Sequence, residues 1–285
     1  MEVSQLDDDL LYLYNNRKSN WIPDIKYIRC SRSEWRLGPI FTEKEIRNLD
    51  RLYNRFISEA SALCVATQAN GSNPGLQAIV KIRMQIRNPK RMPTIPEPAN
   101  FYAARELRAL LELTKRGCTC TPKFLDQIWG EQGTADYVPG GYFAVFVMEK
   151  VPGHNLNHFF DLPMSERDQV RLAFSKSIRE FYSLGFKHED EGRRNLVWDS
   201  ENKKCYIIDL EDAYEVEPPE KPSRFIPELD WHSWEVAGPD LVARAGRTDP
   251  MVPSDKQYIK EPDDETLERW AAEAAGKPEP PKPKW

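Results

Sequence analysis

The chain has 285 residues, of which 40% are hydrophobic, and a formal net charge of -5 at pH 7. These values exclude an intrinsically disordered chain and a protein that coats nucleic acid through bulk positive charge. The length favours about two packed units, and one modest domain with appendages fits equally well.

The start of the chain, MEVSQLDDDLLYLYNNRK, carries acidic residues where a secretory signal is basic, and no apolar run approaches bilayer length. We therefore expect a cytoplasmic protein with neither a membrane nor a nucleic-acid partner. The five cysteines are scattered and odd in number, which argues against a disulfide framework. Cys118 and Cys120 are one residue closer than a CxxC pair and lack a neighbouring histidine, so we interpret them as structural.

The first predicted element is a helix over 42–60, TEKEIRNLDRLYNRFISEA. Thr42 and Glu45 have capping-box spacing, and apolar residues recur at helical intervals from Ile46 to Ile57. Two extended segments follow, SALCVAT at 61–67 and LQAIVKIRM at 76–84. The turn sequence ANGSNPG separates them, which predicts a β-hairpin.

A Pro-rich loop then leads to a predicted helix over 101–117, which Gly117 ends. The apolar run YFAVFVMEKV at 142–151 predicts a strand, and 165–185 predicts a core helix with Ser165 as a plausible cap. Two short strands are expected around Ser200–Asn202. Prolines dominate beyond 217, apart from one short helix over 265–275, and we expect a disordered tail at 276–285.

Polar residues suited to phosphoryl transfer gather in HEDEGRRNLVWDSENKKCYIIDLED, at 188–212. Such transfer needs a carboxylate beside the attacking hydroxyl, oxygen ligands for magnesium and a cation on the phosphates. Asp190 offers the base, while Asn195 and Asp209 offer oxygen ligands. Taken alone, the stretch also fits a polar turn between two strands.

The pattern HxDxxxxN, carried by His188, Asp190 and Asn195 and followed by a strand and Asp209, resembles the protein kinase-like superfamily. IIDLED resembles the aminoglycoside phosphotransferase style of its metal loop. Several stretches of the sequence, among them AIVKIRMQI, MEKVPG and NLVWD, also resemble small kinase-like proteins of filamentous fungi. The resemblance covers roughly residues 60 to 215. It implies an α+β, bilobal kinase-like fold with a small β-rich N-lobe and a reduced helical C-lobe.

The resemblance also implies a site for ATP and Mg²⁺. Asp190 and His188 would be catalytic, and Asn195 and Asp209 would hold the metal. Lys81 would contact nucleotide phosphates and Glu106 on the next helix would be its ion-pair partner. MEKVPG would be the hinge, where the backbone of Glu149 and Val151 binds adenine beside Met148. Without these companions, Lys81 is an ordinary strand lysine and MEKVPG a strand meeting a turn.

The domain organisation that follows has five parts. These are an N-terminal extension at 1–40, an N-lobe with hinge at 41–152, a helical C-lobe core at 153–217, an irregular Pro-rich region at 218–275 and the tail at 276–285.

Three departures from the kinase-like pattern shape the functional expectation. No GxGxxG precedes Lys81, and the basic residues from Arg83 to Arg91 either bind an anion or form a solvated strand edge and loop. No lysine stands two residues after Asp190, for which Arg193 or Arg194 is a possible substitute. The Pro-rich region after Asp209 lacks a platform for a protein substrate.

We therefore expect a phosphotransferase that acts on a hydroxyl of a small molecule. The alternative is a pseudokinase, a scaffold that binds nucleotide or a protein partner without turnover. The stretch DWHSWE at 230–235 could line a pocket, although packing explains it as well.

Overall fold

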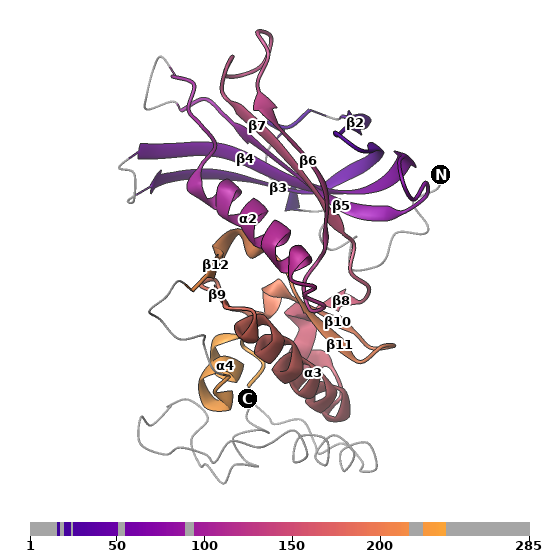
Figure 1. The fold of residues 1–285 in the computed structure, drawn as a ribbon. Coiled ribbons are helices and arrows are strands. Elements are labelled where there is room, and N and C mark those ends of the chain that lie inside the picture. Colours follow the sequence, from indigo (N-terminus) through magenta and orange to yellow (C-terminus); the bar gives the residue numbers. More distant parts are fainter. Residues whose placement is uncertain are drawn as a thin grey trace. The chain divides into compact units, whose positions relative to one another are not determined.

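The computed structural model describes residues 16–17, 20–23, 25–50, 55–88, 94–216 and 225–237, and its fold is α+β (Figure 1). The chain divides into two compact units. Unit 1 comprises Met1–Lys115 and Pro122–Lys150, and unit 2 comprises Arg116–Thr121 and Val151–Trp285. The helix expected over 265–275 and the tail at 276–285 lie outside the described residues.

Unit 1 is built on a seven-stranded sheet with the order β1-β3-β4-β5-β7-β6, in which β2 also pairs with β3. The strands are β1 (Asn16–Arg17), β2 (Tyr27–Arg29), β3 (Glu34–Asp50), β4 (Arg55–Asn70), β5 (Gln77–Gln85), β6 (Phe124–Glu131) and β7 (Tyr142–Glu149). Helix α2 (Phe101–Lys115) lies along one face of this sheet (Figure 1). Part of the range 1–40 thus belongs to the sheet.

The helix predicted over 42–60 is wrong, because 42–50 belong to β3 and 55–60 to β4, and these two strands pair antiparallel. The apolar spacing of this segment fits a helix in isolation. The long pairing of β3 with β4, and of β4 with β5, instead supplies the backbone hydrogen bonds from neighbouring strands. The predicted hairpin of 61–67 with 76–84 is confirmed as β4 and β5.

The two faces of β5 differ in chemistry, since successive side chains of a strand point to opposite faces. Ala78, Val80 and Ile82 enter the apolar core of unit 1. Lys81 and Arg83 point to the other face, and both are buried. This face of β5 therefore carries charge without facing solvent.

Helix α2 begins after Asn100, whose side-chain oxygen accepts a hydrogen bond from the Ala103 amide at 2.7 Å. Its buried residues Ala103, Glu106, Ala109, Leu110 and Leu113 recur at helical spacing. Gly117 follows the helix with φ +73°, a backbone conformation that glycine adopts readily. The helix predicted over 101–117 is thus confirmed.

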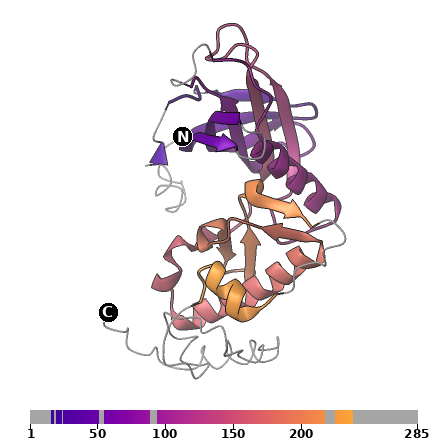
Figure 2. The ribbon, with the colours of Figure 1, turned by 90° about the vertical axis from the view of Figure 1, so that its left-hand side faces the viewer.

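Unit 2 contains the long helix α3 (Met164–Ser183) and, among the described residues, two small sheets. Strands β10 (Leu196–Asp199) and β11 (Lys204–Ile207) form the predicted hairpin, and Figure 2 shows α3 beside it. Strand β8 (His154–Asn155) extends the β10 side, and β9 (Phe186–His188) pairs with β12 (Ala213–Glu215). The cap predicted at Ser165 is wrong, because α3 begins one residue earlier, after Pro163, and has no side-chain cap.

The shorter elements of unit 2 are helical turns at Leu156–Asp161, Arg193–Asn195 and Leu210–Asp212, and helix α4 (Pro227–Ser233). Among the described residues, no helix combines the length and the apolar character that crossing a membrane requires.

Candidate functional site

In unit 1, Lys81 on β5 and Glu106 on α2 form the ion pair that the sequence predicts. The Lys81 Nζ atom lies 2.9 Å from Glu106 Oε1, and the two side chains are only 4% and 2% exposed. Burial makes such a pair sensitive to the loss of either partner, because an uncompensated charge would remain away from water.

Arg83, two residues after Lys81 on the same face of β5, is bound to the same glutamate. Its Nη1 atom lies 3.0 Å from Glu106 Oε2, while Nε and Nη2 donate to Glu59 Oε1 at 2.9 and 2.7 Å. The interpretation of Arg83 as a solvated strand-edge residue is wrong, since α2 covers this face and the side chain is fully buried. Two cations and two carboxylates thus form one compensated network.

The polar groups around Glu59 complete this network. The hydroxyl of Tyr142 on β7 and the amide of Asn100 both donate to Glu59 Oε2. Burial, together with the neighbouring Glu59 carboxylate, raises the pKa of Tyr142 well above its usual value, so its proton stays in place as a donor. Sequence reasoning predicted the Lys81–Glu106 pair but missed the contacts of Glu59, because Glu59 lies in the segment predicted as a helix.

The expected hinge residues lie at and just after the end of β7. Met148 is buried, whereas Glu149 and Val151 are half-buried. The Glu149 amide donates to the Lys123 carbonyl at 2.8 Å, which aligns this strand end with β6. A backbone contact of Glu149 or Val151 with adenine stays a prediction.

In unit 2, His188 links the two halves of the polar stretch that the sequence singles out. Its Nε2 atom lies 3.1 Å from the Asp209 carbonyl oxygen, and its Nδ1 accepts a hydrogen bond from the Asp190 amide at 3.2 Å. These contacts define the neutral tautomer with the proton on Nε2. Burial lowers the pKa of His188, which favours this neutral form. His188 is thus a positioning residue for the two aspartates.

Asp190 is held by two side chains from the turn that follows it. Arg194 pairs with its Oδ1 atom, and Asn195 Nδ2 donates to its Oδ2 at 3.1 Å and to its backbone carbonyl at 2.9 Å. The Asp190 side chain is still 44% exposed. Since the Asn195 nitrogen donates these bonds, its Oδ1 is the atom that can ligate a cation.

Asp209 has a left-handed backbone conformation, with φ 57° and ψ 60°. Aspartate tolerates this region better than most non-glycine residues do, and such conformations concentrate at functional sites. Around it, the Ile208 amide donates to the Asn195 carbonyl and the Glu189 amide donates to the Asp212 carbonyl, at 2.9 and 3.0 Å. Backbone bonds therefore hold Asp209 close to the turn that carries Asp190 and Asn195.

The segment 225–237 packs against His188 and against α3. Sequence reasoning did not predict these contacts. The Trp234 ring lies 5.4 Å from the His188 ring in an edge-on contact, and Trp234 is fully buried. Asp230 accepts a hydrogen bond from the Tyr182 hydroxyl at 2.6 Å, which attaches the segment to α3. For DWHSWE, the packing interpretation is confirmed for Asp230, Trp231 and Trp234, which are buried. The aromatic cluster was its only signal in the sequence.

Asp209 offers a carboxylate oxygen and Asn195 an amide oxygen, and a hard divalent cation such as magnesium prefers oxygen ligands. That these two residues hold the metal stays a prediction. Comparison of the chain with protein-family models and with curated proteins gave no match. The function is therefore inferred from the geometry of these residues.

Proposed function

We propose that the chain is an ATP- and Mg²⁺-dependent phosphotransferase with a bilobal kinase-like fold, acting on a hydroxyl of a small molecule. One observation carries the proposal: the His188 ring bonds both the Asp190 amide and the Asp209 carbonyl. The His188 ring thus holds Asp190, the candidate base, near Asp209, the candidate metal ligand. A polar turn between strands needs no such link.

Unit 1 supports the same proposal by its order of elements. A hairpin of β3 and β4 is followed by β5 with Lys81, then by α2 with Glu106, then by β6 and β7. The kinase-like resemblance implies the order of the strand with Lys81, the helix with Glu106 and the strand that ends at the hinge. The buried Lys81–Glu106 pair fixes the position of a side-chain nitrogen of the type that contacts phosphates.

Each residue has a distinct proposed role. Asp190 accepts the proton of the attacking hydroxyl, since its side chain is 44% exposed and is oriented by Arg194 and Asn195. Asn195 Oδ1 and the Asp209 carboxylate hold Mg²⁺, which neutralises phosphate charge when bound. Lys81 binds the phosphates that are not transferred.

The proposed acceptor is a small molecule because little chain separates Asp209 from the packed segment 225–237. Strand β12 returns to pair with β9 directly after the helical turn Leu210–Asp212. Only the short stretch 216–224 then precedes Phe225, which is itself buried. A stretch of this length is too short to include a segment that presents a peptide substrate.

The second candidate is a scaffold that binds nucleotide without turnover. The sequence favours it because no GxGxxG motif, whose glycines let the backbone approach phosphates closely, precedes Lys81. Binding of ATP without any phosphate transfer would support this second candidate.

The decisive experiment measures the thermal stability of the chain with ATP and Mg²⁺, together with phosphate transfer to a panel of hydroxyl-bearing metabolites. A ligand that binds only the folded state stabilises it, by about 2.7 kcal/mol at a concentration 100 times Kd. The shift should shrink in Asp209→Asn, which loses a metal-ligand charge. It should survive in Asp190→Asn, which should lose transfer alone.

Asp161→Asn is the matched control, because Asp161 is an exposed aspartate that pairs only with His158 among the contacts found in unit 2. It should keep both the shift and the activity of the wild-type chain. Absence of a shift at millimolar ATP with Mg²⁺ would refute both candidate functions. Full transfer by Asp190→Asn and Asp209→Asn would refute the assignment of roles.

A further inference from the structure

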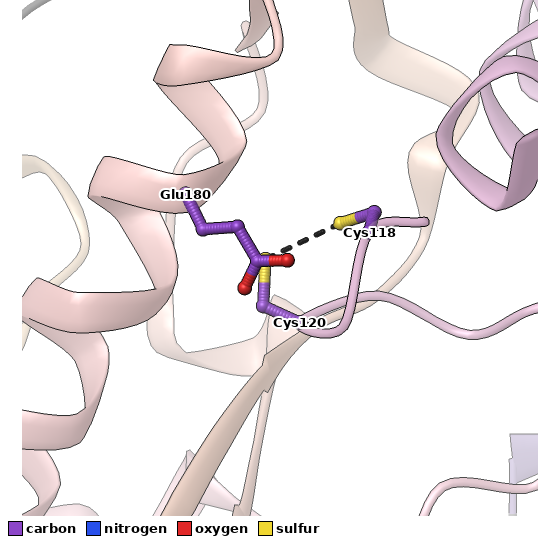
Figure 3. A group of neighbouring side chains, drawn as sticks. All are labelled: Cys118, Cys120 and Glu180. Atoms are coloured by element: carbon purple, nitrogen blue, oxygen red, sulfur yellow. Dashed lines mark hydrogen bonds between the residues drawn. The ribbon is translucent and has the colours of Figure 1, made fainter. Parts of the chain in front are cut away.

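Cys118 and Cys120 lie in the segment Arg116–Thr121 of unit 2, with their sulfur atoms facing each other (Figure 3). The two Sγ atoms are 3.5 Å apart, and the residues are 2% and 0% exposed. Both thiols are free. From the sequence we interpret this pair as structural, because its spacing is one residue short of CxxC and no second pair or histidine lies nearby in the chain.

Helix α3 supplies that third group, the carboxylate of Glu180, which Figure 3 shows beside the two sulfurs. One ligand atom from each of Cys118, Cys120 and Glu180 lies within 4.8 Å of the others. Such a set of two thiolates and a carboxylate is one that zinc accepts.

We propose that Cys118, Cys120 and Glu180 form a binding site for a thiophilic divalent cation, with Zn²⁺ as the best-fitting ion. This inference does not depend on the proposed phosphotransferase function. A water molecule would complete a tetrahedron around the ion.

The distance between the sulfur atoms favours a tetrahedral metal over two other chemistries. Two Zn–S bonds of about 2.3 Å at a tetrahedral angle place the sulfurs roughly 3.8 Å apart, and a linear dithiolate with the same bonds places them roughly 4.6 Å apart. A disulfide needs about 2.05 Å. The observed 3.5 Å is nearest to the tetrahedral value, so the pair needs little rearrangement to bind the ion.

Thr119, the residue between the two cysteines, holds Glu180 in place. Its amide donates to Glu180 Oε1 at 2.6 Å and its hydroxyl donates to Oε2 at 2.8 Å. Hydrogen bonds of this kind orient metal ligands in the outer shell of a site. Because Thr119 is exposed and Glu180 half-buried, the ion can reach the site from solvent.

The thiols must lose their protons to bind the ion. The hydrogen bond from the Cys120 thiol lowers the pKa of Cys118 to about 7, so its thiolate forms readily near neutral pH. Cys120 keeps its proton more strongly, and this single proton has two acceptors within reach, the Cys118 sulfur at 3.5 Å and the Ser177 carbonyl at 3.2 Å. Metal binding should therefore release protons and weaken as the pH falls.

The ion would join two parts of unit 2, the segment 116–121 and α3, which hydrogen bonds already connect to β11. Cys120 already accepts a hydrogen bond from the Ile207 amide of β11 at 2.8 Å, and Ser177 of α3 donates to the Cys205 carbonyl. A metal bridge from Cys118 and Cys120 to Glu180 adds a direct bond between 116–121 and α3. We expect the folded state to gain stability with the metal.

The test uses Cd²⁺ as a spectroscopic probe and Zn²⁺ in competition with a chromophoric chelator, on the full chain kept reduced. We expect one Cd²⁺ per chain, with an ultraviolet thiolate-to-metal charge-transfer band, and a higher Tm with Zn²⁺. Cys118→Ser and Cys120→Ser should each weaken the band and lose the Tm gain. Glu180→Gln should keep the band but bind Zn²⁺ at least tenfold more weakly.

Two further variants distinguish loss of metal binding from loss of folding. Thr119→Val changes an exposed residue and should weaken Zn²⁺ binding about 10- to 100-fold by releasing Glu180. Cys64→Ala removes a buried thiol of unit 1 and should leave binding unchanged. Absence of the band in the wild-type chain would overturn the proposal. So would a band of equal strength in both serine variants, or unchanged Zn²⁺ affinity in both Glu180→Gln and Thr119→Val.

Discussion

The two units hold their candidate functional residues by different means. In unit 1, Lys81, Arg83, Glu59 and Glu106 are buried and compensate one another through side-chain ion pairs. In unit 2, Asp190 and Asp209 are only partly buried. The main contacts that place them run from the His188 ring and the Asn195 backbone to main-chain atoms.

This difference separates folding from function in the two units. A buried charge network cannot lose one member without leaving an unpaired charge. Asp190 is positioned through its backbone amide, so its side chain can be replaced while the backbone keeps its place. Substitutions in unit 1 should therefore cost stability, whereas those at Asp190 should cost activity alone.

The largest expected effect is that of Arg83→Met. It leaves Glu59 and Glu106 with one cation between them, and breaking a buried ion pair costs about 3–5 kcal/mol. Urea unfolding followed by fluorescence measures this loss. Arg36→Met, at an exposed arginine of β3, should stay within about 0.5 kcal/mol of the wild type. A loss below 1 kcal/mol for Arg83→Met would contradict the compensated network.

Lys81→Met should cost less, about 1.5–3 kcal/mol, the range for a hydrogen bond to a charged group. Glu106 keeps Arg83 as a partner at 3.0 Å, so both carboxylates still contact a cation, although one negative charge is in excess. If Lys81 binds phosphate, the same variant should also lose the thermal shift with ATP and Mg²⁺. Lys123→Met, at an exposed lysine before β6, serves as the control. Equal losses for Lys81→Met and Arg83→Met would mean that Arg83 does not share Glu106.

The third prediction concerns the pH dependence of stability through His188. Its pKa in the folded chain lies below the ordinary value of about 6.5, chiefly because of burial, although the Asp209 and Asp190 carboxylates oppose the shift. Between the two pKa values the unfolded chain binds more protons. The contribution of the neutral His188 ring to the free energy of unfolding is therefore complete above pH ~6.5, and it is lost as the pH falls toward the pKa of His188 in the folded chain. The slope is at most about 1.4 kcal/mol per pH unit.

Urea unfolding between pH 7.5 and about pH 5 measures this slope. His188→Asn should flatten it, while His232→Asn, at an exposed histidine of α4, should leave it unchanged. A slope that persists in full in His188→Asn would contradict a buried neutral ring.

The smallest expected change in stability is that of Asp190→Asn. Its side chain is 44% exposed and its backbone stays bonded to His188, so the free energy of unfolding should change by less than about 1 kcal/mol. Phosphate transfer should fall about 10²–10⁴-fold if Asp190 is the base. A large loss of stability would show that the ion pair with Arg194 is structural.

Local sequence determined several elements of this protein. Helix α2, the β4–β5 hairpin, strand β7 and the β10–β11 hairpin follow from apolar periodicity and turn residues nearby in the chain. The pairing of Lys81 with Glu106 was predicted from a resemblance spread over many residues. The nucleotide and metal roles of these residues stay predictions.

Only the tertiary structure decided the rest, because the deciding contacts join residues distant in sequence. Strand β3 replaced a plausible helix once β4 offered hydrogen-bond partners, and β6, which no strand was predicted for, pairs with β7. Arg83 is buried because α2 covers its face of β5. Glu180 reaches Cys118 and Cys120 from a helix some sixty residues later in the chain, at a sequence separation of 61 from Thr119. No local sequence pattern predicts contacts between residues so far apart in the chain. Burial and charge compensation arise only when the chain folds.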